Sequence, residues 1–97
     1  MTFEFYAEAE AEMLAGIDYL DGQEFGLGLR LTREIYSTIR RIVENPNAWP
    51  KSSSRTRRCF TKRFRYQIIY QIRNDEIHIV AVAHTSRRPG YWKSRLR

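Results

Sequence analysis

The sequence has 97 residues, of which 17 are Lys or Arg and 11 are Asp or Glu, so its formal net charge is +6. This length suits one domain over residues 1–97, and a hydrophobic fraction of 42% is too high for a disordered chain. No apolar run could cross a membrane, and the N-terminus lacks the basic flank and apolar core of a secretory signal. The single Cys excludes an internal disulfide and a Cys-rich zinc site, and it fits a reducing cytoplasm.

The charge is distributed unevenly along the chain. Residues 1–45 contain nine acidic and four basic residues, a net charge of −5, whereas residues 46–97 contain thirteen basic and two acidic residues, a net charge of +11. This asymmetry favours a basic working face in the second half. Such a face suits a polyanionic partner: nucleic acid, an acidic protein segment or a membrane surface. The alternative is a solvated surface that only keeps the protein soluble.

The first half is predicted to form one strand and two helices. Phe3 and Phe5 flank Glu4, and this alternation predicts a short strand. Apolar residues at spacings of three and four then predict a helix from about residue 8 that ends at Asp21-Gly22. A second stripe predicts another helix, which ends at Asn45-Pro46 because proline disfavours helical geometry in the residue before it. The two stripes are Ala9, Met13, Ile17 and Leu20, and Leu31, Ile35, Ile39 and Ile42.

In the second half of the sequence, apolar residues recur at every second position. Residues 46–56 hold two prolines and three serines and are predicted to be a loop. Strands are predicted at residues 57–60, 66–73 and 77–83. Asn74-Asp75 is the expected turn between the last two strands. The order indicates an α+β, two-layer β-α-α-β-β-β domain, with the helix hairpin packed on a mainly antiparallel sheet. Gln67 and Gln71 would lie on the other face, where a functional surface is expected.

No recognised catalytic or metal-binding motif is present. Gly26-Leu27-Gly28 lacks the Lys-Ser/Thr of a phosphate-binding loop and precedes a helix. His78 and His84 would share one face of a regular strand, but roughly 20 Å apart, too far to hold one metal ion. Cys59 follows two arginines that would lower the pKa of its thiol, and the preferred alternative is a buried structural cysteine. No cofactor and no metal are therefore predicted.

Basic and proton-transferring side chains gather in the second half. A metal-independent ribonuclease needs groups that transfer protons and cations that stabilise the phosphorane, and His, Tyr, Arg and Lys supply both. The same residue types suit a surface that binds RNA or an acidic peptide. His84 and Tyr91 also have structural alternatives, at a strand end and in tail packing. If the chain is a nuclease, the candidate catalytic residues are Arg63, His84, Arg87 and Tyr91. The candidate partner-binding residues are Arg58, Lys62, Arg65, Arg88 and Lys93.

A resemblance to known proteins is carried by four segments: FGLGLRL, IVENPNAWP, RFRYQIIYQI and IVAVAHTSRRPGYWKSR. In this order they resemble the RelE/ParE superfamily of bacterial type II toxins over nearly the whole chain. The resemblance implies a β-α-α-β-β-β fold and a cytoplasmic protein that arrests growth. It also implies a small cognate antitoxin whose extended acidic segment neutralises the toxin, in a possible toxin–antitoxin hetero-oligomer.

The resemblance implies two possible mechanisms. ParE-like members inhibit DNA gyrase, whereas RelE-like members cut messenger RNA on the ribosome, using basic sheet residues and a C-terminal Tyr or His. The G-L-G and N-P elements favour the ParE-like, plasmid-stabilisation branch, and Lys62 stands alone where the RelE pattern has a dense lysine cluster. A RelE-like endoribonuclease is the alternative, and a non-toxic module that binds RNA or an acidic peptide is the second alternative. Whether the chain is an enzyme stays open.

Overall fold

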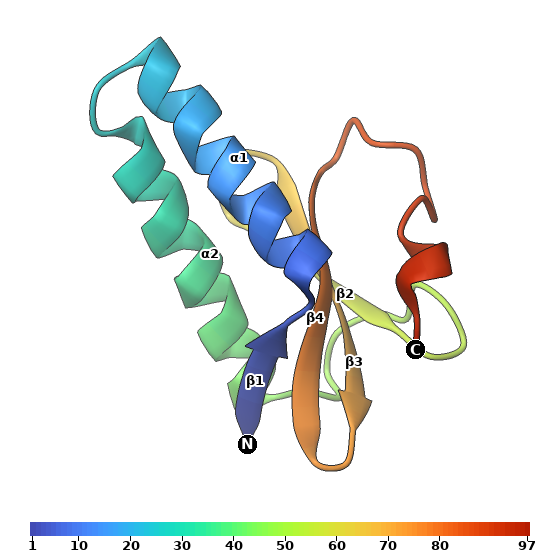
Figure 1. The fold of residues 1–97 in the computed structure, drawn as a ribbon. Coiled ribbons are helices and arrows are strands. Elements are labelled where there is room, and N and C mark those ends of the chain that lie inside the picture. Colours follow the sequence, from blue (N-terminus) through green and yellow to red (C-terminus); the bar gives the residue numbers. More distant parts are fainter.

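The computed structural model describes residues 1–97, and its elements follow the predicted order (Figure 1). The helices are α1 (Ala7–Gln23) and α2 (Leu27–Glu44). The strands are β1 (Thr2–Phe5), β2 (Arg57–Phe60), β3 (Tyr66–Arg73) and β4 (Glu76–His84), and a short 3-10 helix, η1 (Lys93–Arg95), follows them. The predicted α+β class is confirmed. Neither helix combines the length and apolar character that crossing a membrane requires.

The four strands form one sheet in the order β1-β4-β3-β2. The β2–β3 and β3–β4 pairs are antiparallel, while β1 runs parallel to β4, with Thr2 opposite Glu76. Asn74 and Asp75 join β3 to β4 and have φ angles of 53° and 59°. A two-residue hairpin needs this left-handed geometry at both positions, so the predicted turn is confirmed.

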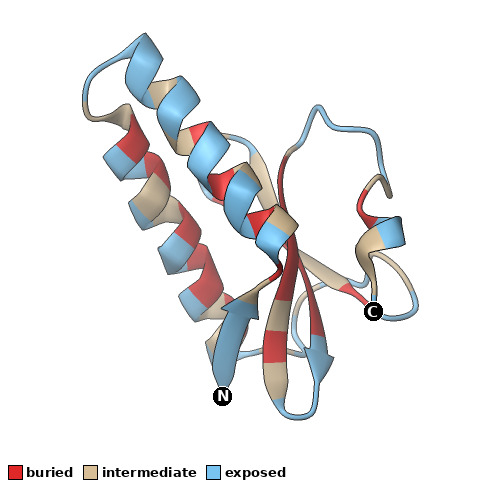
Figure 2. Ribbon diagram, in the orientation of Figure 1, coloured by how far each residue is buried: buried red, intermediate tan, exposed pale blue.

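The helix hairpin covers one face of the sheet, and the buried residues of both layers meet between them (Figure 2). The predicted apolar stripe of α2 is fully buried against isoleucines of β3 and β4. In α1, Gly16 lets the helix lie close to the Tyr66 side chain of β3, because a Cβ atom at this position would lie 2.7 Å from the Tyr66 hydroxyl. Cys59 belongs to the same core, and burial raises the pKa of its thiol, as expected of a structural cysteine.

The loop between the helices differs from the prediction. Helix α1 runs through Gly22 to Gln23, so the expected end at Asp21-Gly22 is wrong. Asp21 is instead the residue that caps α2, because its carboxylate accepts the backbone N–H of Gly28 at 2.8 Å. The chain turns at Gly26, whose φ of 92° lies in the left-handed region that glycine adopts without strain.

A β-bulge in β4 places the two histidines on opposite faces of the sheet. Ile69 lies opposite Ala81 and Tyr70 lies opposite Ile79, so one residue of β4 is extra. His84 pairs with Tyr66 on the helix face, whereas His78 pairs with Gln71 on the other face. The expectation that both histidines share a face is wrong, because the extra residue reverses the alternation. No group of His, Cys, Asp and Glu side chains is arranged to hold a metal ion.

The second face of the sheet is covered by the C-terminal segment. Trp92 is 4% exposed and packs into the core. Gln71 points to this face as predicted, but it is buried there and donates to the Tyr6 hydroxyl at 2.7 Å. The guanidinium of Arg97 lies 4.4 Å from the centre of the Tyr6 ring. The face expected to be open is therefore partly closed by the chain itself.

Candidate functional site

One hollow on the second face gathers four of the nine residues that the sequence predicts as site residues. It has a volume of about 260 Å³ and lies between β2, β3 and the segment after β4. The four residues are Arg58, Arg87, Arg88 and Tyr91. His84 borders a different hollow of about 250 Å³ beside α1, and Arg87 is the residue that borders both.

Lys62, Arg63 and Arg65 lie in the turn between β2 and β3 and border neither hollow. The φ angle of Arg65 is 55°, in the left-handed region, which costs a residue other than glycine about 1–3 kcal/mol. Glu34 of α2 holds the turn in place, because its carboxylate accepts the backbone N–H groups of Lys62 and Arg63 at 2.6 and 2.9 Å. The three basic side chains are exposed. The turn therefore presents cations at a fixed position.

A carboxylate of α1 ties the C-terminal segment to the sheet. Glu12 accepts the Tyr91 hydroxyl at 2.5 Å, and Arg95 donates to both of its oxygens at 2.8 and 3.0 Å. The Val82 backbone N–H donates to Glu12 at 3.1 Å, and Arg87 lies 3.6 Å from it. The Arg87 guanidinium also stacks 3.9 Å from the centre of the Tyr91 ring. We refer to these residues, Glu12, Val82, Arg87, Tyr91 and Arg95, as the Glu12 cluster.

The Glu12 cluster changes the acid–base properties of Tyr91. Burial and the hydrogen bond to the Glu12 carboxylate raise the pKa of Tyr91 far above its ordinary value. The hydroxyl is therefore protonated and already donating at neutral pH. His84 is engaged as well, since its Nδ1 accepts the backbone N–H of Ser86 at 3.1 Å and its ring meets the edge of Tyr66 at 5.4 Å.

Sequence reasoning did not single out Glu12 or Arg95. A signal for Glu12 exists, because it lies three residues after the buried Ala9 and four before the buried Gly16, at the edge of the apolar stripe of α1. A carboxylate in that position requires a partner. Nothing in the local sequence shows that the partner is Arg95, 83 residues further along the chain.

Two matches to known proteins bear on the family. Residues 3–89 match the ParE toxin of the type II toxin–antitoxin system, parDE. The structure is similar to a solved structure of the chromosomal ParDE TA system from P. aeruginosa, with a TM-score of 0.77 and 16% sequence identity, and the match covers 87% of this chain and 95% of that chain. No curated protein matches the sequence significantly. The structural likeness supports the fold, and the family match extends over most of the chain. The chain therefore belongs to the ParE toxin family of type II toxin–antitoxin systems.

Proposed function

We propose that this toxin arrests bacterial growth by blocking DNA gyrase rather than by cutting messenger RNA. The observation that carries the choice is the Glu12 cluster. The hydroxyl that a nuclease would use, that of Tyr91, already donates its proton to the Glu12 carboxylate within the chain. The proposal implies that the toxin acts in the cytoplasm, where gyrase works.

The positions of the candidate catalytic residues support the same choice. Cleavage without a metal needs a proton acceptor, a proton donor and a cation within hydrogen-bond reach of one phosphate. Arg63 lies in the β2–β3 turn, His84 borders the hollow beside α1, and Tyr91 belongs to the tail. Residues 90–97, which include Tyr91, also lie outside the segment that matches the family. This distribution favours a toxin that acts by binding its target.

The antitoxin is proposed to bind the toxin through an acidic segment. The candidate contacts are Arg58, Lys62, Arg65, Arg88 and Lys93. None of these side chains forms an ion pair within the chain, whereas Arg87, Arg95 and Arg97 pair with Glu12 or Glu8. All but Arg58, which is half-buried, are exposed. Cations without internal partners are the ones that an acidic partner can pair with at the least desolvation cost.

The test compares gyrase inhibition with RNA cleavage on one set of proteins. Purified wild-type toxin is added to gyrase-dependent supercoiling of relaxed plasmid and, separately, to a translating extract with a labelled transcript. We expect supercoiling to stop and the transcript to stay intact, and Tyr91→Phe should inhibit gyrase as wild type does. Tyr19→Phe is the matched control, since Tyr19 is 65% exposed. If wild type and Tyr19→Phe cut the transcript and Tyr91→Phe does not, the toxin is a nuclease and the proposal is wrong.

A further inference from the structure

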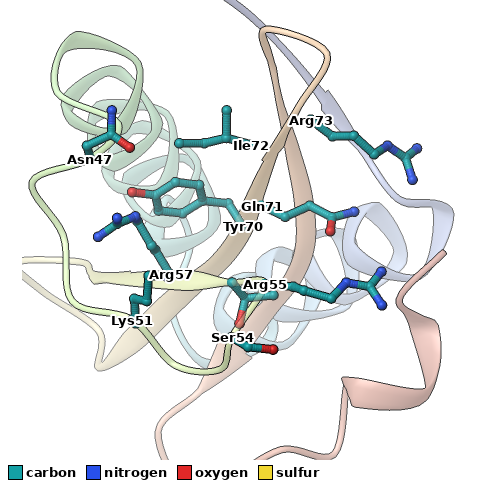
Figure 3. A pocket seen from close by; sticks show the side chains of 10 residues that line it. Asn47, Lys51, Ser54, Arg55, Arg57, Tyr70, Gln71, Ile72 and Arg73 are labelled. Carbon is teal, nitrogen blue, oxygen red and sulfur yellow. The ribbon is translucent and has the colours of Figure 1, made fainter.

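A second basic hollow lies at the opposite end of β3 from the β2–β3 turn. It has a volume of about 360 Å³ and is formed by the loop before β2, the start of β2 and the last residues of β3. Its cations are Lys51, Arg55, Arg57 and Arg73, and Asn47 and Ser54 add polar groups. Figure 3 shows Arg55 and Arg73 extending in the same direction on one side, with Arg57 beside the Tyr70 ring on the other. None of these residues belongs to the candidate catalytic or antitoxin-binding sets.

No acidic side chain compensates the positive charge of this hollow. No acidic residue lines it, and the four ion pairs of the structure involve other cations, namely His78, Arg87, Arg95 and Arg97. Four like charges that line one concave surface repel one another and raise the local positive potential. A bound anion would relieve that repulsion. The tail, in which Glu12 and Glu8 neutralise the arginines, lacks this property.

The hollow is held in shape by hydrogen bonds that leave most of its donors unused. Arg57 donates to the Trp49 carbonyl at 2.7 Å, and Arg55 and Arg73 both donate to the main-chain oxygen of Arg97, the last residue of the sequence, at 3.2 and 2.6 Å. Two guanidiniums thus already converge on one oxygen atom. Thr56 is 2% exposed, and its hydroxyl bonds to Ser52 and Ser53, which fixes the loop. Each guanidinium has five N–H donors, so several remain for a ligand.

We propose that this hollow binds the phosphodiester backbone of a nucleic-acid duplex. Arg, Lys, Ser and Asn side chains are among the groups that proteins use to contact backbone phosphates. Two N–H groups of one guanidinium can donate to two oxygens of the same phosphate. An acidic peptide fits less well, because peptide anchors fill apolar pockets and only Tyr70 and Ile72 are apolar here. Tyr70 is 0% exposed and cannot stack on a base, as proteins that bind single strands require.

The binding is therefore independent of base sequence and sensitive to salt. Each phosphate contact adds about −0.9 to the slope of log affinity against log salt concentration. The proposal does not depend on gyrase inhibition, because it concerns the purified toxin and nucleic acid alone. A toxin that fails to inhibit gyrase can still bind a duplex, and the reverse also holds.

The test is fluorescence anisotropy of a labelled DNA duplex of about two helical turns, titrated with the full chain at several salt concentrations. The variant is Lys51→Gln, Arg55→Gln and Arg73→Gln together. It should lower the affinity by an order of magnitude or more, and the salt slope should become shallower by about 2–3. The control removes three charges from the exposed surface of α2, with Arg30→Gln, Arg33→Gln and Arg40→Gln, and should leave most of the affinity and the slope in place.

A single variant covers the case in which the triple variant does not fold. The Lys51 side chain makes no hydrogen bond or ion pair within the chain, so Lys51→Glu leaves the internal contacts intact. This single substitution should lower the affinity of the toxin for the duplex. Equal losses in the hollow variant and the α2 variant would overturn the proposal, since net charge alone would then explain binding. Tighter binding of a single strand, or of a glutamate-rich peptide of equal charge, would overturn it as well.

Discussion

Replacing Glu12 by glutamine tests whether one carboxylate holds the C-terminal segment in place. Both oxygens of Glu12 are acceptors: one receives Arg95 and the Val82 N–H, and the other receives Tyr91 and the second Arg95 nitrogen. Glutamine supplies one acceptor oxygen and one donor NH₂ group. In either orientation of the amide, an N–H group faces another donor, and the positive charge of Arg95 loses its counter-charge.

The expected loss of stability follows from the burial of this pair. Removing one partner of a buried ion pair costs about 3–5 kcal/mol. Hydrogen bonds to charged groups contribute about 1.5–3 kcal/mol each. The side chains of Glu12 and Arg95 are each 15% exposed, so water relieves part of the cost. We therefore expect Glu12→Gln to lower the free energy of unfolding by about 2–4 kcal/mol, a large share of the 5–15 kcal/mol of a typical domain.

Guanidinium chloride unfolding at pH 7, followed by far-UV circular dichroism, measures this loss. Glu10→Gln is the matched control on the same helix, because Glu10 is exposed and forms no ion pair, and it should change stability by less than about 0.5 kcal/mol. Trypsin should also cleave the segment after Trp92 faster in Glu12→Gln. A Glu12→Gln protein as stable as wild type, with the same denaturant dependence, would refute the reasoning and assign the tail to apolar packing alone.

Three further predictions concern other contacts. The raised pKa of Tyr91 contributes stability that is fully present below the unfolded value of 10.0 and is lost as pH rises from there toward the folded value. Wild type should therefore lose stability relative to Tyr91→Phe as the pH of denaturant titrations is raised above 10, and a constant difference would contradict this. Asp21→Ala removes the cap of α2 and should cost about 1 kcal/mol, against no measurable change for the exposed Asp18→Ala, by the same unfolding assay. Lys62→Gln with Arg65→Gln should weaken antitoxin binding in calorimetry without loss of growth arrest, and unchanged affinity would remove the β2–β3 turn from the antitoxin interface.

The sequence was sufficient for the elements and their order because local spacing carries that information. The stripe of α2, the alternation of β3 and the Asn74-Asp75 turn depend on residues within a few positions of one another. Each of these features also persists in the folded chain, since the buried face of α2 is the face that the stripe defines.

The features that sequence reasoning missed depend on long-range packing. The bulge in β4 arises from the fit between β3 and β4, and no residue of the segment IVAVA, residues 79–83, predicts it. The covering of the second face requires the C-terminal segment to return to the sheet, where Trp92 joins the core. The predicted site residues therefore lie in four places, namely the two hollows, the β2–β3 turn and, for Lys93, η1, although their residue types and their common half of the chain suggested one.

The parallel pairing of β1 with β4 has a consequence for how the toxin is made. Strand β1 comes first in the chain, but its only partner begins at Glu76, so the sheet cannot close until most of the chain has been synthesised. Until then α1 and α2 have no sheet to cover their apolar faces. The β3–β4 hairpin closes a short loop and forms early, whereas joining β1 to it closes a long one. We therefore expect the pairing of the N-terminal strand to be a late step of folding, and a nascent toxin to lack its finished surface until β4 has been synthesised.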